Sequence, residues 1–226
     1  MTRLLLRSAA PLLGVALAAL AGPAAAQSVY AGVGSTGLTL GYAHNYSAML
    51  GARAEFTTLP STSRTYTQDN IDYGGNVTSR RVAALFDWHP MSGGFRLTAG
   101  LSAGNSKGEF FGAPSTGGTI TIGTATVPYG PGDRYDVKAE FPSTMPYVGL
   151  GFGHAPVRGW GFHADLGVLL GKATVTGALS PSLAAKITAT GGNPQAELDK
   201  ELAKVRETTD KMIGVPVLSL GVSYRW

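Results

Sequence analysis

Cysteine is absent from this 226-residue sequence, and charged residues make up only 14% of it. Without cysteine the chain has no disulfide, no thiol nucleophile and no cysteine-ligated zinc site. A domain of this size without disulfides must be stabilised by a full core or by closure of a sheet. The four histidines lie in separate segments and have no metal-ligand spacing. We therefore expect neither a metal nor a cofactor.

A long apolar run is also missing. The segment from Ser8 to Gly22 is shorter than the ~20 residues that a transmembrane helix needs. It follows Arg3 and Arg7 and precedes three alanines, 24–26, which is the arrangement of a secretory signal peptide. No charged cluster follows, which disfavours the alternative of an N-terminal membrane anchor. We expect 1–26 to be a signal peptide for Sec export and 27–226 to be the mature chain.

A strongly basic surface is not expected either. Loss of the two signal-peptide arginines reduces the 18 basic residues to 16, against 14 acidic ones, so the mature net charge is +2. No basic stripe alternates with aromatic residues, and we expect no nucleic-acid partner.

Glycine is abundant, with 32 residues. Many of these glycines occupy alternate positions in segments of period two, in which apolar residues alternate with glycine, serine or isolated charges. Such alternation predicts strands with two different faces. Eight segments show it: 28–34, 37–44, 48–58, 80–90, 94–104, 146–154, 161–171 and 214–226.

A soluble β-sandwich would also alternate. Two features favour a membrane barrel: the non-apolar face lacks a dense layer of charged residues, and short turns alternate with long polar connections at 59–79, 105–144 and 172–213. The sequence therefore predicts an all-β fold, an eight-stranded antiparallel outer-membrane β-barrel. Its first two strands are expected at 28–34 and 36–44. The alternative is one strand over 28–44 with another at 183–191.

Aromatic residues cluster beside the expected short turns and the C-terminus. Barrels carry such residues at the membrane interfaces. The candidates for this aromatic girdle are Tyr42, Trp88, Phe95, Phe152 and Trp160, with Tyr46, Tyr224 and Trp226 beside them.

Charged residues also fall on the inward face of the expected strands. An eight-stranded lumen is just filled by side chains, and unpaired charges there would cost several kcal/mol each. We therefore expect a salt-bridge network that plugs the lumen; a polar conduit for small solutes is the alternative. The expected members of the salt-bridge network are Arg53, Glu55, Arg81, Asp87, Arg96, His163, Asp165 and Arg225.

One segment has helical rather than strand periodicity. Asn193 can cap a helix whose first residue is Pro194, and apolar residues then recur at helical spacing. We expect one amphipathic helix at about 194–211, in the last long connection. It would either cover the barrel's own rim or loops or bind a partner helix as a coiled coil.

Two catalytic or nucleotide-binding interpretations receive little support. The segment "GVGSTG" (32–37) matches a dinucleotide fingerprint, but a strand pattern follows where a helix is required. A lipid-modifying hydrolase needs a nucleophile beside a histidine. His163 and Asp165 share a face without a placed nucleophile, and Ser47 lies near His44 without an acid. We expect no enzyme.

The segments "DWHPMSGGFRLTAGL", "PYVGLGFGH" and "GWGFHADLGVLLG" and the ending "GVSYRW" carry a resemblance. With them, the whole of 27–226 resembles the small outer-membrane β-barrel proteins of Gram-negative bacteria, around the OmpA transmembrane domain and OmpW, in an uncharacterised proteobacterial subgroup. The resemblance implies a place in the outer membrane, contact with its lipid and lipopolysaccharide, and partners in periplasmic chaperones and the barrel-assembly machinery. It also implies an assembly signal made of Leu218, Leu220, Val222, Tyr224 and Trp226, although phenylalanine is the usual last residue.

Three functions remain open at this point. The first is a structural or surface-interaction protein with a plugged lumen, whose external ligand, if it has one, is unknown. The second is a narrow porin for small solutes, and the third is a lipid-modifying enzyme.

Overall fold

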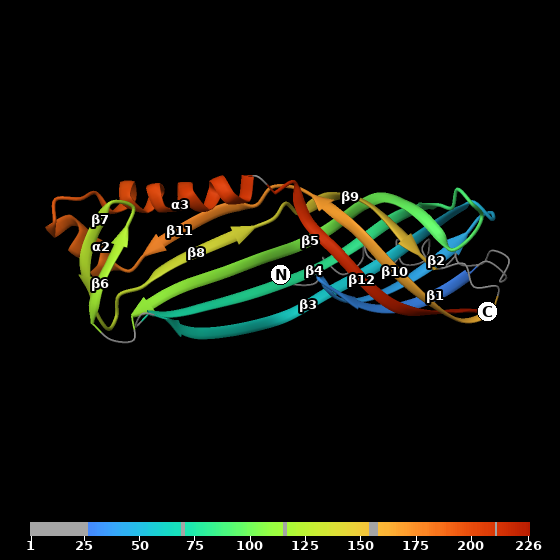
Figure 1. Cartoon of the computed structure of the whole chain (residues 1–226), viewed down its shortest axis with the longest axis horizontal. Helices are drawn as coiled ribbons and strands as arrows, with labels where there is room; N and C mark the ends of the chain where they lie inside the picture. Colours follow the sequence, from blue (N-terminus) through green and yellow to red (C-terminus); the bar gives the residue numbers. More distant parts are fainter. Residues whose placement is uncertain (1–26, 69–70, 115–116, 154–157, 211) are drawn as a thin grey trace, which may run out of the picture.

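A computed structural model describes residues 27–226 apart from 69–70, 115–116, 154–157 and 211. The expected signal peptide, 1–26, and His154 lie outside the described residues. The fold is mostly β-sheet with two helices in the described part of the chain, and the molecule is elongated (Figure 1). Its elements are β1 Gln27–Gly34, β2 Gly37–Asn45, β3 Leu50–Gln68, β4 Ile71–Trp88, β5 Phe95–Pro114, β6 Gly118–Ile122, β7 Ala125–Tyr129, β8 Tyr135–Glu140, β9 Thr144–Phe152, β10 Gly159–Leu170, β11 Thr174–Leu179, α2 Pro181–Ala189, α3 Pro194–Asp210 and β12 Gly214–Arg225.

A barrel-like unit forms the half of the molecule that contains the C-terminus. Neighbouring strands pair antiparallel in the order β1, β2, β3, β4, β5, β9, β10, β12, and β12 also pairs with β1. The segment 28–44 is therefore two strands, as expected, and the single-strand alternative is wrong. The expected strand at 183–191 in that alternative is largely helical.

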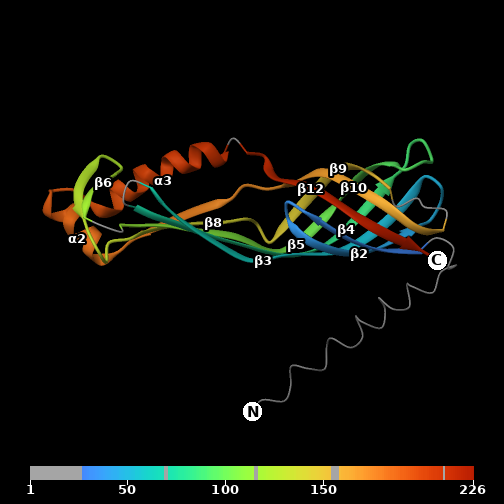
Figure 2. The same ribbon diagram turned by 60° about the horizontal axis from the view of Figure 1, so that its bottom comes forward.

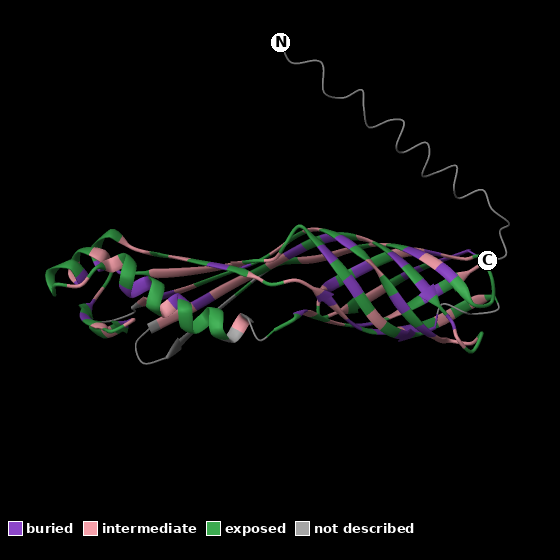
Figure 3. Ribbon diagram, turned by 90° about the horizontal axis from the view of Figure 1, so that it is seen from above, coloured by how far each residue is buried: buried purple, intermediate pink, exposed green. Residues whose placement is uncertain are grey.

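The two faces of this unit differ as the period-two pattern predicts. Apolar side chains point outward and are exposed: Leu40 is 61% and Phe162 80% exposed. Arginine, aspartate, serine and tyrosine point inward and are buried, so bands of exposed and buried residues alternate along each strand (Figure 3). A water-soluble protein rarely exposes so large a continuous apolar surface.

Beyond the barrel-like unit, β3, β4 and β5 continue as a sheet that β8 and β11 extend. The hairpin β6–β7 and both helices lie at this far end, opposite the C-terminus (Figure 2). We call these parts together the extension. The segments 59–79, 105–144 and 172–213 were expected to be polar loops, and that expectation is wrong, because much of each is strand or helix. In these segments threonine, tyrosine and glycine occupy both faces of the strands. The alternation of apolar and polar residues, from which the other strands were predicted, is therefore absent there.

Helix α3 begins where the sequence predicts, because Asn193 Oδ1 accepts hydrogen bonds from the backbone N–H groups of Gln195 and Ala196 at 3.0 and 3.1 Å. Its buried Leu198 and Leu202 pack against Val175 of β11. The helix thus covers the chain's own extension, and the expected choice between covering the barrel's rim or loops and binding a partner helix stays a prediction.

Helix α2 was not expected. Ser180 caps it, and Leu183 and Ile187 pack against Ile122 of β6 and Val127 of β7. The Ser-Pro pair at 180–181 and the i,i+4 apolar pair were the signals that could have predicted it. No helix in the described part of the chain is long and apolar enough to cross a membrane.

Candidate functional site

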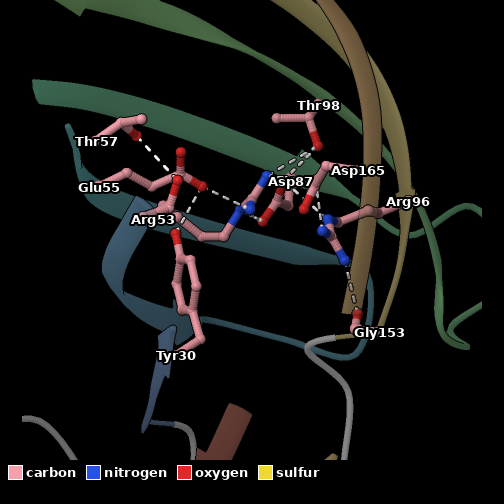
Figure 4. A network of polar contacts seen from close by, with 10 residues as sticks. Tyr30, Arg53, Glu55, Thr57, Asp87, Arg96, Thr98, Gly153 and Asp165 are labelled. Carbon is pink, nitrogen blue, oxygen red and sulfur yellow. Dashed lines mark hydrogen bonds and ion pairs between the residues drawn. The ribbon is translucent and has the colours of Figure 1, made fainter. Parts of the chain in front are cut away.

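A cluster of five charged side chains lies inside the barrel-like unit (Figure 4). Arg53 of β3 binds Glu55, Asp87 and Asp165, with N–O distances of 2.9, 2.6 and 3.3 Å. Arg96 of β5 binds Asp165 at 2.6 Å and Asp87 at 3.7 Å. Each arginine therefore bridges carboxylates from different strands, so the cluster ties β3, β4, β5 and β10 together across the lumen.

Neutral groups complete the hydrogen bonding of this charged cluster. The Tyr30 hydroxyl donates to Glu55 at 2.7 Å, and the Thr98 hydroxyl donates to Asp87 at 2.6 Å. Arg96 donates to the carbonyl of Gly153 at 2.9 Å and is fully buried. Two guanidinium groups face three carboxylates, which leaves a formal charge of −1. Buried charges persist when they are paired and hydrogen-bonded in this way.

The sequence placed eight residues in this network, and the structure brings five of them together. Arg81 is also buried on the inward face, but it donates to neutral groups: the Ser102 hydroxyl at 2.9 Å and the Ser143 carbonyl at 3.0 Å. It ties β4 and β5 to the start of β9 at the mouth nearer the extension. His163 packs edge-on against the Tyr30 ring, with 5.2 Å between ring centroids. Arg225 is half-buried, opposite Ser28.

Tyr30 and Thr98 were not among the residues expected in the network. Both occupy positions of the period-two pattern that face inward. This alternation was the sequence feature from which their inward direction could have been predicted. The spacing of residues along the sequence could not show which inward polar side chains contact one another. Arg53 and Asp165, for example, are 112 residues apart.

An apolar layer lies on the same inner face, between the charged cluster and Arg81. Leu85, Met145, Tyr147 and Leu169 are buried together there. Along β4 the inward side chains run from Arg81 through Leu85 to Asp87, so polar, apolar and charged layers follow one another down the lumen. A void of about 50 Å³ remains beside Arg81 and Glu55.

The expected girdle residues lie near the end of the barrel-like unit that is remote from the extension. Trp88, Phe152 and Trp160 are exposed, while Tyr42 and Phe95 are half-buried. Trp160 stacks edge-on with Tyr224, with ring centroids 5.3 Å apart. The expected assembly-signal residues alternate outward on β12 and beyond its end, and all are exposed: Leu218, Leu220, Val222, Tyr224 and Trp226.

The Asp165 carboxylate, which shares the inward face of β10 with His163, is bound by both Arg53 and Arg96. No group of three or more histidine, aspartate or glutamate side chains that could hold a metal ion occurs in the part of the chain that the structure describes.

A second charged group lies outside the barrel-like unit, where α3 meets the β6–β7 turn. Glu197 accepts hydrogen bonds from Lys200 at 2.7 Å and from the backbone N–H and hydroxyl of Thr124 at 2.6 and 2.9 Å. The Lys200 ammonium group, together with the Thr124 donors, lowers the pKa of Glu197 to about 2. The carboxylate is thus ionised at neutral pH and pins α3 to the hairpin.

Comparison with known proteins identifies this fold. No protein-family model matches the sequence, and no curated protein is detectably similar to it. Two solved structures are similar: CarO2 of Acinetobacter baumannii, with a TM-score of 0.62 and 16% identity, and CarO of the same organism, with a TM-score of 0.55 and 15% identity. The chain shares their fold. The alignments cover 89% and 88% of this chain and 98% and 97% of those two chains. At this identity the match concerns the fold alone, and the expected membership of the OmpA or OmpW group stays a prediction.

Proposed function

We propose that this chain is an outer-membrane protein whose eight paired strands close into a transmembrane barrel, with a plugged lumen and a structural or surface-interaction role. One observation carries the proposal: the exposed face is apolar and the enclosed face holds buried charges, the reverse of a soluble domain. That arrangement suits a lipid exterior and a polar interior.

The dimensions of the strands support this proposal. β10 and β12 have 12 residues each. At ~3.3 Å per residue and a tilt of ~40°, such a strand rises about 30 Å, which accommodates the ~25 Å apolar band of an outer-membrane barrel. The outward residues would contact lipid and lipopolysaccharide, and the barrel-assembly machinery and periplasmic chaperones would act before insertion. The proposal includes no catalytic activity.

Gln27, at the start of β1, and Trp226 both lie at the short-turn end of the barrel, so we place that end in the periplasm and the extension outside the cell. The absence of native cysteine allows a direct test. We expect a cysteine replacing the exposed Ala203 on α3 to react with a membrane-impermeant maleimide on intact cells. A cysteine replacing the exposed Met91, in the β4–β5 turn, is the matched control and should react only after the outer membrane is permeabilised. The opposite pattern would overturn the orientation.

The plugged lumen predicts that the purified protein gives no stable single-channel openings in planar bilayers. The charged cluster and the apolar layer of Leu85, Met145, Tyr147 and Leu169 support this expectation, because their side chains are buried on the inward face. The void of about 50 Å³ beside Arg81 favours the second candidate, a narrow channel, because it has room for a few water molecules. Reproducible openings of the unsubstituted protein would contradict the plug and support the channel.

A further inference from the structure

A large cavity lies in the extension, outside the barrel. It has a volume of about 1000 Å³, is open on one side, and is lined by the sheet strands, by β6 and by α3. Apolar side chains line most of it: Leu59, Val77, Phe110, Ile120, Leu202 and Val205 are among them. Pockets for small organic molecules in proteins have volumes of about 300–1,000 Å³ and mainly apolar walls. The cavity is thus large enough for such a molecule.

The floor of the cavity depends on two glycines. Phe110 lies between Gly75, its partner across the strands, and Gly108 on its own strand. A Cβ at Gly75 would come within 2.8 Å of the Phe110 ring, and one at Gly108 within 2.9 Å. The ring therefore lies flat on the sheet, which leaves the space above it open. Any side chain at either glycine would push the ring toward α3.

The roof of the cavity, α3, is held in place by two other elements. A Cβ at Gly177 would lie 3.0 Å from Leu202 and 3.2 Å from Leu198, so this glycine lets α3 approach β11 closely. In the same turn of α3, the ionised Glu197 fixes the helix to Thr124 in the β6–β7 turn. The helix is therefore positioned by its contacts with β11 and with the β6–β7 turn.

The residues that line the cavity favour an uncharged ligand over a charged one. Glu201 is the one charged residue of the lining in the described part of the chain, and it already binds Lys204 at 2.9 Å and the backbone N–H of Gly123 at 3.3 Å. In contrast, Phe110 is 48%, Val77 40% and Val205 36% exposed. A ligand that covered these side chains would be stabilised by about 25 cal/mol of binding free energy for each Å² of apolar surface removed from water.

We propose that this cavity is a binding site for an uncharged, lipophilic small molecule with an aromatic or acyl body. Along β4 the cavity face continues into the lumen face, but Arg81 and the hydrogen bond between Ser79 and Ser106 lie between them. The site is therefore an external receptor pocket, separate from the plug.

The test uses the full-length protein in lipid nanodiscs, with Val205→Cys labelled by an environment-sensitive fluorophore at the cavity rim. We expect 2-naphthalenemethanol to shift the emission saturably, as it displaces the dye from the cavity. The anionic 2-naphthoate should bind at least about tenfold more weakly, since it would place a second carboxylate near Glu201. The same dye on Ala203→Cys, on the exposed side of α3, should not respond.

Two variants decide whether the response comes from this cavity. In the labelled background, Val77→Trp fills the cavity and should weaken binding at least about tenfold, whereas Thr78→Trp, on the opposite face of β4, should leave it unchanged. If Val77→Trp fails to fold, as judged by heat-modifiable migration, Gly75→Ala provides the second test, because it pushes Phe110 into the cavity. A non-saturable response, or unchanged binding in the folded cavity variants, would overturn the proposal; tighter binding of 2-naphthoate would overturn its uncharged-ligand part.

Discussion

Replacing Arg96 with methionine is expected to destabilise the barrel by about 3–5 kcal/mol, because removal of one partner of a buried ion pair leaves a buried charge uncompensated. Arg96 is fully buried and binds Asp165 at 2.6 Å. Without it, Arg53 alone faces three carboxylates: Glu55, Asp87 and Asp165. The urea midpoint of unfolding in lipid should fall, and the single-channel record should show openings that the unsubstituted protein lacks.

The matched control is Arg80→Met. Arg80 is exposed and lies next to Arg81, which faces inward, and surface substitutions usually change stability by no more than about 0.5 kcal/mol. The double variant Arg96→Met with Asp165→Asn removes one charge of each sign, so it should recover more than half of the lost stability. Equal stability of Arg96→Met and the unsubstituted protein would mean that the ion pairs of Arg96 do not stabilise the barrel, and an unchanged single-channel record would contradict the plug.

The faces of the strands could be predicted from the sequence because side-chain direction is a local property. In a strand every second residue points the same way, so the inward places of Arg53, Asp87 and Arg96 followed from alternation with apolar neighbours. The glycines and serines of the inward face gave the same information. No tertiary contact was needed for that step.

The partners within the charged cluster could not be predicted in the same way. Pairing across a lumen depends on strand tilt and register, which no single strand encodes. Arg81 was expected among carboxylates, yet it bonds serine hydroxyls and backbone carbonyls near the mouth. Conversely, Tyr30 and Thr98 complete the cluster although they are neutral and did not stand out among the charges.

The extension was missed because its strands do not present a regular apolar face to lipid or to a core. Its apolar contacts form between distant pieces, such as Val175 with Leu198 and Ile122 with Ile187. The flat position of Phe110 over Gly75 depends on a cross-strand register that the sequence does not display. Strand formation there follows from the pairing with β8 and β11, and so from tertiary structure.

Replacing Leu166 with arginine is the second large effect that we expect. Leu166 lies near the middle of β10, is 53% exposed, and faces outward between Leu150 and Leu218 on the neighbouring strands. Arginine on the lipid face of a barrel costs about 2–4 kcal/mol at the bilayer midplane. In a water-soluble protein, the same change at a half-exposed position away from the core would alter stability by only about 0.5 kcal/mol.

The depth of the substituted residue provides the control for this prediction. Ile213 is 71% exposed and directly precedes β12, at the mouth nearer the extension, where arginine should cost only about 0–1 kcal/mol. Unfolding by urea in phospholipid vesicles should therefore separate Leu166→Arg from Ile213→Arg by at least about 1 kcal/mol. Equal costs at the two positions would contradict a membrane-embedded β10, because a soluble protein has no midplane and only a bilayer makes the cost of a charge depend on depth.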